Sequence, residues 1–584
     1  MAKQIWKALD DLSPSQVKLR NLPRKPNSLY NLSVNEYGQL EKRAGFSKYN
    51  TTSLGASHKI TGMHRYYYST ASKEFLVAWN TKWYKLSETT PWAGTALYST
   101  GTTDFATTAD QDTYFCDFGD VCYGVNGVGV FKYDGTFNRI LGITPPAAKP
   151  TGVAVGSGGS LGAGDYKYCY TYVDEDGYES NASAVSDAVA CVASDSVTLT
   201  IVNSTDPKIA SRNIYRTSVG GAIYYYEGAV ADNTTESFTS SIADTLLQTE
   251  VATNHTAPPT TSHLITKRRN KLYLAYGGYL YPSHTSDVEY YPATWRQRTG
   301  NSQKIMGLLE QLTALPVATE DSIERLVGTD EDNFEFKNSY STEGCVAMRS
   351  YVNCDNLIVY LGQNGINYFD GTTSGIFSQA INEYIKDNIV DAYRHLSCAT
   401  YFDDKYILCY PKTGSTVPSE TIWIDLKNKT FGVYSFAFSC FSLWNRGTDG
   451  LQLKAGSNTI GQVYSLFSGL DDDTAAITAY DQIEPLDLGM PEIYKQWYSV
   501  FVKIKSTTGT AFKFYYKLDN DADWTLASKT ITADTTKWYR ISLGGGGKRG
   551  RTFTPKPYMS DKYNFEIHGY MVCYEPEPFA EENN

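Results

Sequence analysis

The amino-acid sequence predicts an all-β protein: a β-propeller of about seven blades with an inserted fibronectin- or immunoglobulin-like β-sandwich, followed by a C-terminal β-sandwich. Three observations predict this class. Tyr, which favours pleated strands, occurs 47 times, against 7 Met and 7 His. Short alternating runs are separated by Asn-Gly and Asp-Gly pairs, which are typical of hairpins. One such segment also returns later in the chain, whereas helical periodicity is weak except near residues 378–389.

The returning segment gives the length of a repeat. GVFKYDGT (129–136) and GINYFDGT (365–372) share glycine, an aliphatic residue, two variable residues, an aromatic residue and Asp-Gly-Thr, at an offset of 236. Without an insert of 113 residues (145–257), the offset is 123, or three steps of 41. Propeller blades repeat every ~40–50 residues, so about seven fit into 49–144 and 258–470. Two longer units, or a chance echo of turn chemistry, are the alternatives.

The flanking segments differ in composition from the repeat region. Residues 14–48 are polar and basic with Pro at 14, 23 and 26, which predicts an extended N-terminal arm over 1–48; the arm packs on another surface or, as the alternative, is freely solvated. Pro-rich linkers bracket the insert at 145–257, whose short strands suit a sandwich of roughly 100 residues. Alternating strands over 471–576 predict a jelly-roll-like sandwich, and 577–584 form an acidic tail.

No pattern in the sequence predicts catalysis, and we expect no enzyme, no cofactor and no metal. The ten Cys form no CxxC pair and lie mostly in apolar runs, which is typical of buried thiols. GGSLG (158–162) matches the serine-hydrolase pattern but lies in a Gly/Ser-rich linker, without the required strand-to-helix turn. DEDG (174–177) and DNDAD (519–523) lack the closing Glu of a calcium loop, so structural calcium remains only an alternative there.

The charge balance argues against a broad basic surface for nucleic acid. The chain has 52 basic and 63 acidic residues, a net charge of −11. A local basic cluster, GGGGKRGR (544–551), does not have P-loop spacing. Lys548, Arg549 and Arg551 are candidate contacts to nucleic acid or an acidic partner, and solvated side chains are the alternative. No apolar window is long enough to span a membrane and no signal-peptide core is present, so we expect folding in a reducing cytosol.

Four segments carry a resemblance to a known family. They are NSLYNLSVNEYGQLEKRAGF (27–46), KRRNKLYLAYGGYLYPSHTSDVEYY (267–291), GCVAMRSYVNCDNLIVYLGQNGINYFDG (344–371), and the insert's GDYKYCYTYVDEDGYES with RNIYRT. The first segment is similar to an N-terminal motif of the form Lys/Arg-Arg-x-Gly. The second and third segments are similar to blade motifs, and the fourth is similar to fibronectin-like modules of phage structural proteins. Together they resemble the tail nozzle or hub proteins of short-tailed bacteriophages, the tail tubular protein B and packaged-DNA stabilisation protein family.

The resemblance implies a structural virion protein of the tail, assembled in the host cytoplasm. Such proteins form a ring, here expected to be a hexamer, that extends the DNA channel below the portal and adaptor. The implied partners are an adaptor ring similar to tail tubular protein A, tail fibres or spikes, and packaged double-stranded DNA that passes without sequence specificity. The alternative is a receptor- or glycan-binding tail adhesin with a propeller body. A glycan-degrading propeller enzyme would need a carboxylate pair in the propeller mouth.

Overall fold

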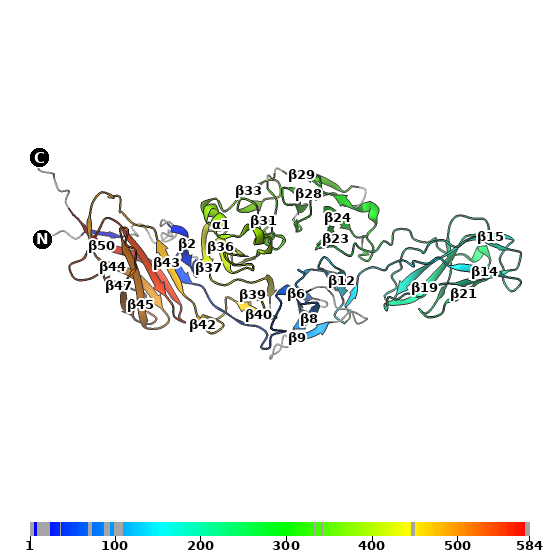
Figure 1. Ribbon diagram of the computed structural model, residues 1–584, viewed down its shortest axis with the longest axis horizontal. Helices are drawn as coiled ribbons and strands as arrows, with labels where there is room; N and C mark the ends of the chain where they lie inside the picture. The colour runs from blue at the N-terminus through cyan, green and yellow to red at the C-terminus, as the bar shows by residue number, and fades with distance from the viewer. Residues whose placement is uncertain are drawn as a thin grey trace. The chain divides into compact units, whose positions relative to one another are not determined.

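The chain is all-β, as predicted. The computed structural model describes residues 5–8, 24–35, 37–67, 73–86, 94–97, 109–136, 138–285, 287–311, 314–330, 333–339, 341, 343–445 and 450–577. These residues contain strands β1 to β50, the short α-helix α1 (Asn382–Asn388) and a few 3-10 turns (Figure 1). The chain forms two compact units: unit 1 is Met1–Ile60, Thr90–Ala93 and Cys345–Asn584, and unit 2 is Thr61–Thr89 and Gly94–Gly344.

Unit 2 is organised around four antiparallel sheets, each of four strands that are neighbours in chain order. The first sheet is β6 (Ile60–Tyr67), β7 (Lys73–Trp79), β8 (Lys82–Leu86) and β9 (Gly94–Leu97). The second is β10 (Tyr114–Phe118), β11 (Val121–Val125), β12 (Val130–Tyr133) and β13 (Asn138–Ile140). The third is β22 (Leu264–Arg268), β23 (Lys271–Tyr276), β24 (Tyr279–Pro282) and β25 (Gln297–Arg298). The fourth is β26 (Gly307–Leu308), β27 (Leu315–Ala318), β28 (Ile323–Val327) and β29 (Glu335–Asn338).

Unit 1 continues the same repeat with three more groups of four strands. The fifth group is a separate sheet, β30 (Val352–Cys354), β31 (Leu357–Leu361), β32 (Ile366–Phe369) and β33 (Ser374–Ile376). The sixth is β34 (Cys398–Phe402), β35 (Lys405–Tyr410), β36 (Glu420–Asp425) and β37 (Thr430–Tyr434). The seventh is β38 (Cys440–Asn445), β39 (Leu451–Gly456), β40 (Val463–Leu466) and the N-terminal strand β5 (Phe46–Lys48), with β41 (Asp471–Asp472) and β42 (Ala475–Ala476) added at its edge.

Consecutive sheets contact one another through their first strands. Within unit 2, β10 contacts β22 and β22 contacts β26; within unit 1, β30 contacts β34 and β34 contacts β38. The first and second sheets also meet here, since the Thr113 N–H donates to the Thr61 carbonyl at 2.9 Å. Gly62 permits this approach, because a Cβ atom there would lie 2.5 Å from the Thr113 carbonyl oxygen. Blades of a propeller meet in this way, with the first strands nearest the central channel.

The repeated segment occupies equivalent places in two of these sheets. GVFKYDGT covers β12 and the turn after it, and GINYFDGT covers β32 and the turn after it. Both are third strands, and their sheets lie three groups apart in the chain, as the spacing predicted. Asp134 accepts the Thr136 N–H at 2.7 Å, and Asp370 accepts the Thr372 N–H at 2.8 Å. The echo is therefore a turn that joins the third and fourth strands.

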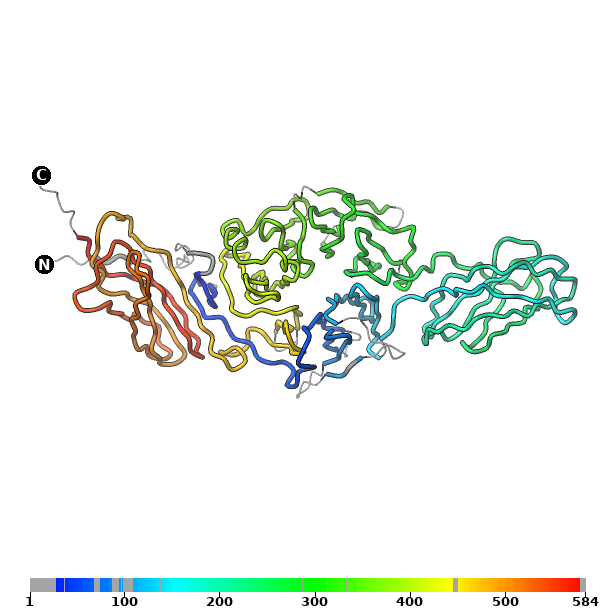
Figure 2. Tube along the Cα trace, viewed as in Figure 1, coloured from blue at the N-terminus to red at the C-terminus, as the bar shows by residue number. Residues whose placement is uncertain are grey.

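The insert expected at 145–257 forms a β-sandwich of short strands (Figure 2). One sheet is β14 (Thr151–Val155), β18 (Ser196–Thr200) and β21 (Ser237–Ser240), and the other is β16 (Tyr168–Asp174), β19 (Ile209–Arg216) and β20 (Tyr225–Val230). β15 (Gly164–Tyr166) and β17 (Val189–Cys191) form a two-stranded ribbon. Alternate residues of β16 point inward, so Tyr168 and Tyr170 pack with Leu199 and Ile214 in a common core.

Ion pairs with buried cations join the insert to the second sheet of unit 2, and one of these cations also pairs with Glu289, which lies between β24 and β25 of the third sheet. The Lys132 ammonium lies 2.6 Å from Glu289 and 3.0 Å from Asp176, which belongs to the DEDG turn of the insert. Arg139 pairs with Asp176 at 3.0 Å and with Glu175 at 2.9 Å. Lys132, Arg139 and Glu289 are largely buried, whereas Glu175 and Asp176 of the insert are about half exposed, so only the Lys132–Glu289 pair is shielded from solvent. The insert is thus fixed at its base by charge as well as by two linkers.

The C-terminal sandwich takes strands from both ends of the chain. One sheet has the order β3 (Leu32–Val34), β4 (Leu40–Lys42), β50 (Phe565–Pro576), β44 (Lys495–Ser506) and β47 (Lys537–Ser542), with β1 (Ile5–Ala8) on β50 and β48 (Lys548–Gly550) on β44. The other continues the sixth group through β2 (Arg24–Tyr30), β43 (Ala479–Ile483), β49 (Phe553–Met559), β45 (Thr510–Leu518) and β46 (Thr525–Ile531). Figure 1 shows β44, β45, β47 and β50 lying together in this sandwich.

This arrangement corrects the expectation of a separate arm at 1–48. Among the described residues, β2 to β5 pair within this chain: Tyr30 is paired with Tyr480, and Leu40 with Ile567. Leu32 is fully buried in the core of the sandwich, with other apolar residues of this segment around it. The segment is extended because it forms strands. The Pro and basic residues around these strands made their alternation of apolar and polar residues hard to recognise in the sequence. The acidic tail at 577–584 lies outside the described residues except for Glu577.

The N-terminal segment is held by one buried arginine, at the place where the chain passes from β4 to β5. The Arg43 guanidinium makes a two-point contact with the Asp472 carboxylate, at 2.6 and 2.8 Å. Its Nε donates to Asn31 at 2.8 Å, and its plane lies 4.8 Å from the ring centre of Phe436. Asn31 in turn accepts the Ser435 N–H at 2.9 Å. Three sheets of unit 1 therefore meet at this side chain.

Replacing Arg43 with Ala should lower the free energy of unfolding of unit 1 by about 3–5 kcal/mol, because it leaves the Asp472 carboxylate without its two-point partner and removes one hydrogen bond from Asn31. Urea unfolding followed by tryptophan fluorescence measures the change. Lys48→Ala is the matched control: its pair with Asp473 is more exposed, so its loss should cost less than about 1 kcal/mol. Equal effects of the two substitutions would contradict a special role for Arg43.

A half-buried histidine makes the stability of unit 2 sensitive to acid. Burial lowers the pKa of His263 to about 4, although its Nε2 lies 2.8 Å from the Ile305 carbonyl oxygen. Between pH 6.5 and 4 the unfolded chain binds a proton that the folded chain does not, so stability falls as the pH falls through this window.

His263→Gln should remove this part of the pH dependence, which amounts to on the order of 2–3 kcal/mol between pH 6.5 and 4. Urea midpoints measured at several pH values for both proteins test it. His395→Gln, which removes an exposed imidazole, serves as the control and should keep the wild-type slope. If the urea midpoint of His263→Gln changed with pH as steeply as that of the wild type, another group would be responsible for the acid sensitivity.

Candidate functional site

The predicted basic loop lies at the edge strand β48 of the C-terminal sandwich. Lys548, Arg549 and Arg551 are all exposed. Arg549 forms an ion pair with Glu577 at 2.9 Å, and its guanidinium lies 3.8 Å from the ring centre of Tyr494. The Arg551 guanidinium lies 4.6 Å from the centre of the same ring. Both arginines thus contact one tyrosine, and Lys548 is exposed on the same strand as Arg549.

In each of the two acidic turns that resembled calcium loops, one Asp carboxylate oxygen accepts backbone N–H groups. In DEDG, Asp174 accepts backbone N–H groups from Asp176 and Tyr178, at 3.0 and 2.9 Å. In DNDAD, Asp519 accepts the N–H groups of Arg551 and Thr552, at 2.6 and 2.8 Å. These carboxylate oxygens stabilise turns, which is the ordinary use of Asp in such positions.

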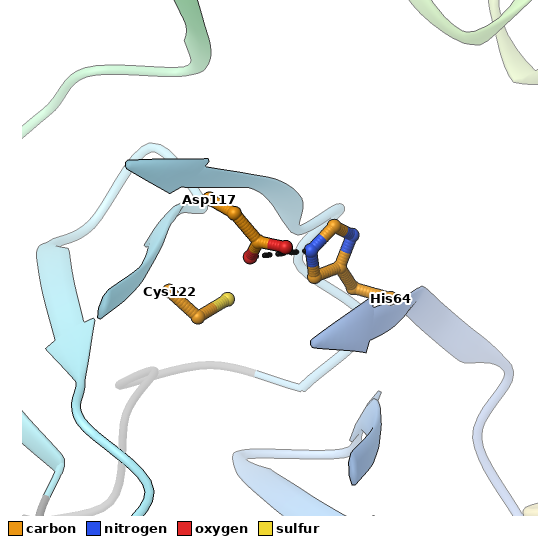
Figure 3. Close-up of side chains that lie close together, drawn as sticks. All are labelled: His64, Asp117 and Cys122. Atoms are coloured by element: carbon orange, nitrogen blue, oxygen red, sulfur yellow. Dashed lines mark hydrogen bonds and ion pairs between the residues drawn. The ribbon is translucent and has the colours of Figure 1, made fainter. Parts of the chain in front are cut away.

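A third group of side chains was not predicted from the sequence: His64, Asp117 and Cys122 lie together in unit 2 (Figure 3). His64 is on β6 of the first sheet, and the other two are on β10 and β11 of the second sheet. His64 Nε2 lies 2.6 Å from a carboxylate oxygen of Asp117. One atom from each residue, the imidazole nitrogen, the carboxylate oxygen and the sulfur, lies within 4.8 Å of the other two.

Local structure fixes all three side chains. Asp117 and Cys122 are directly opposite each other in the β10–β11 hairpin, so their side chains project to the same face. The hydrogen bond between Thr113 and Thr61 brings β6 alongside β10 and carries His64 to that face. The imidazole is stacked on Phe115, with ring centres 5.7 Å apart and planes 13° from parallel. The cluster is therefore built on strands and not on mobile loops.

The environment of the cluster favours neutral sulfur. Burial raises the pKa of Cys122 well above its ordinary value, and the charge of Asp117 and a hydrogen bond to it act in the same direction. The sulfur is fully buried, whereas His64 and Asp117 are about one-quarter and one-fifth exposed. A catalytic thiolate needs an exposed sulfur and a nearby cation. This arrangement, with the carboxylate as hydrogen-bond partner of both thiol and imidazole, is unsuited to nucleophilic catalysis.

Part of this cluster was open to prediction. The segment Asp117-Phe-Gly-Asp-Val-Cys122 has a Gly-Asp turn at its centre, and a tight hairpin there places Asp117 opposite Cys122. Nothing local points to His64, which lies 53 residues before Asp117 and belongs to another sheet. The signal that would have found it is the contact between successive sheets, which a single sequence does not reveal.

A second feature is an aromatic and basic face on the nine-stranded sheet of unit 1. We call it the Lys–aromatic face; it comprises Tyr480, Tyr515, Lys517, Trp524, Lys556 and Tyr558. Cross-strand pairing aligns Tyr480 with Tyr558, and Tyr515 with Lys556. The alternate residues of β45, such as Phe514 and Tyr516, are buried in the sandwich core, so these side chains form the outer surface.

The lysine ammonium groups of this face lie close to its aromatic rings. The Lys556 ammonium lies 4.1 Å from the ring centre of Tyr480 and 5.0 Å from that of Trp524, and Lys517 lies 5.2 Å from Trp524. Burial lowers the pKa of Lys556, and the neighbouring charge of Lys517 lowers it further. Partly exposed aromatic rings with two lysines among them can bind a planar or ring-shaped ligand that carries negative charge.

No family model matches the chain, and no curated protein matches it. Among solved structures, similar chains include BBS1N in complex with ARL6DN (8% identity, TM-score 0.28, covering 73% of this chain and 98% of that one). An exo-beta-1,3-galactanase from Phanerochaete chrysosporium is 7% identical (TM-score 0.17, 79% and 95% covered), and the AfRom2 CNH domain is 7% identical (TM-score 0.24, 72% and 99% covered). At these TM-scores the likenesses carry no argument about function. Among the described residues, no helix has the length and apolar character needed to cross a bilayer.

Proposed function

We propose that this protein is a structural component of a bacteriophage virion, the tail nozzle or hub of a short-tailed phage. In this role it forms a ring, a hexamer in the family it resembles, that extends the DNA channel below the portal and adaptor. The ring retains packaged double-stranded DNA and opens for ejection. Its further partners are an adaptor ring similar to tail tubular protein A and tail fibres or spikes. The site of action is the virion tail, after assembly in the host cytoplasm.

The observation that carries this proposal is the place of the resembling motif at 42–45. Gly45 admits no side chain, because a Cβ atom would lie 1.8 Å from the Asp471 carbonyl oxygen. Arg43 fills the junction described above, and Lys42 donates to the Asp561 carbonyl at 2.7 Å. The Lys-Arg-x-Gly motif therefore builds the passage by which β5 reaches the seventh sheet. A motif with this structural task fits a scaffold protein and not a catalyst.

The topology supports a closed propeller as the body of the ring. β5, the strand that precedes the first sheet, completes the seventh sheet beside β40. In a circular arrangement the first and last sheets are neighbours, so a strand from the start of the chain can join the last sheet. Blades bury their faces against one another, and such a body is rigid enough to resist the pressure of packaged DNA. A net charge of −11 suits a channel through which DNA slides without sticking.

The purified protein, alone and with its adaptor ring, should form rings of six-fold symmetry in negative-stain images and a matching mass by light scattering. Rings follow from the heterologous contacts that a closed nozzle requires. Arg43→Ala should reduce ring assembly, since it loosens the sheets of unit 1, whereas Lys48→Ala should not. Three-fold rods from the wild-type protein would exclude the nozzle and favour a fibre.

The Lys–aromatic face favours a second candidate function, a receptor- or glycan-binding tail adhesin with a propeller body. Its partly exposed rings and lysines suit an acidic polysaccharide on a host surface. In this case Trp524→Ala and Lys556→Ala should each reduce binding to host envelope glycan at least tenfold, as measured on a glycan-coated surface. Lys529→Ala, an exposed lysine on the edge strand β46 outside this face, is the control. Unchanged binding in both variants would exclude this face as the receptor site.

A further inference from the structure

The cluster of His64, Asp117 and Cys122 combines three kinds of metal ligand. An imidazole nitrogen, a carboxylate oxygen and a thiol sulfur meet in one place, from two different sheets. Calcium and magnesium select oxygen ligands, so a site containing nitrogen and sulfur is not suited to them. Zinc accepts all three donors at 2.0–2.3 Å and is the common ion for mixed sites of this kind.

The separations in the cluster are close to those of a tetrahedral site. Nitrogen and oxygen ligands of one zinc ion lie roughly 3.3 Å apart, and sulfur lies roughly 3.6 Å from either, given the bond lengths of such sites. His64 Nε2 and the Asp117 oxygen are 2.6 Å apart, and the three ligand atoms all lie within 4.8 Å of one another. A shift of less than an ångström in each side chain, with the ion replacing the hydrogen bonds, would give this geometry.

The surroundings favour binding of an ion over a simple hydrogen-bonded cluster. The hairpin fixes Asp117 opposite Cys122, and stacking on Phe115 fixes the plane of the imidazole, so little order must be created on binding. Cys122 is fully buried, which protects the sulfur, while the partial exposure of His64 and Asp117 leaves a path for the ion.

We infer that His64, Asp117 and Cys122 bind one zinc ion per chain. His64 coordinates through Nε2, Asp117 through a carboxylate oxygen and Cys122 through its sulfur, which loses its proton to solvent on binding. Three protein ligands leave the fourth position to a water molecule. The ion bridges β6 of the first sheet to the β10–β11 hairpin of the second, and thus adds a coordinate cross-link between two successive sheets of unit 2.

Metal content and a cobalt titration of the full-length protein test this inference. Protein purified without chelator should contain close to one zinc ion per chain, as measured by elemental mass spectrometry. After zinc removal, Co²⁺ should bind with the same stoichiometry and give the intense visible bands of tetrahedral cobalt together with a thiolate-to-cobalt charge-transfer band in the near ultraviolet.

Variants separate this site from other thiols. Cys122→Ser should lose the charge-transfer band and weaken zinc binding at least tenfold, and His64→Ala should weaken it similarly. Cys116→Ser is the matched control, because Cys116 is a buried thiol on β10 whose side chain packs in a different core. It should retain full binding. Equal binding by Cys122→Ser and the wild type, or no zinc and no cobalt binding by the wild type, would overturn the inference.

Hydrogen exchange supplies a readout that does not need any variant to fold. Zinc added to the metal-free wild-type protein should slow amide exchange in 60–67 and 114–125, the strands that the ion joins, and leave the insert unchanged. Uniform slowing, or none in these strands, would contradict a cross-link at this place. Because this test uses neither rings nor DNA, its failure is distinct from a failure of the nozzle proposal.

Discussion

The buried guanidinium of Arg43 is the interaction on which the order of unit 1 depends. A charge withdrawn from water must be fully paired and hydrogen-bonded, or the fold loses several kcal/mol. Here the partners are Asp472, beside the seventh sheet, and Asn31, between β2 and β3. One side chain thus fixes the place where the chain passes among three sheets. The two sheets of the sandwich, the sixth group and the seventh group cannot shift independently without breaking these contacts.

The repeat was predictable because its signals are local. Asp-Gly and Asn-Gly turns, alternating apolar residues and a fixed spacing all lie within about 40 residues, the length of one sheet. The strands β2 to β4 were missed for the opposite reason. The sheet partners of β2 and β4 lie more than 400 residues away, as in the pairing of Tyr30 with Tyr480, whereas β3 pairs with β4. Short strands among Pro and Lys therefore look like an arm. Only the tertiary fold shows that their apolar residues enter a core.

The candidate sites also combine features that the sequence reveals with partners that only the fold reveals. The basic triplet was visible in the sequence, but Tyr494 and Glu577, which engage Arg549, are remote in the chain. The DEDG segment forms a turn that Asp174 stabilises, and its charges also pair with Lys132 and Arg139 at the base of the insert. The histidine of the zinc cluster carried no local signal at all. Sequence patterns therefore located the loops, and the fold supplied the partners that give each loop its chemistry.

Both special features of the repeat region lie where separate sheets meet. The leading strand β6 of the first sheet begins at Ile60, whose N–H donates to the Ser457 carbonyl at 3.0 Å and whose carbonyl accepts from the Ser439 hydroxyl at 2.6 Å. The hydrogen bond between Thr61 and Thr113 supports this strand at its start, and the His64 cluster lies further along it. A coordinated ion there would stabilise the joint without adding apolar area. At the other end of the repeat, Arg43 does the equivalent task with a carboxylate in place of a metal, and in both places polar interactions hold the sheets together.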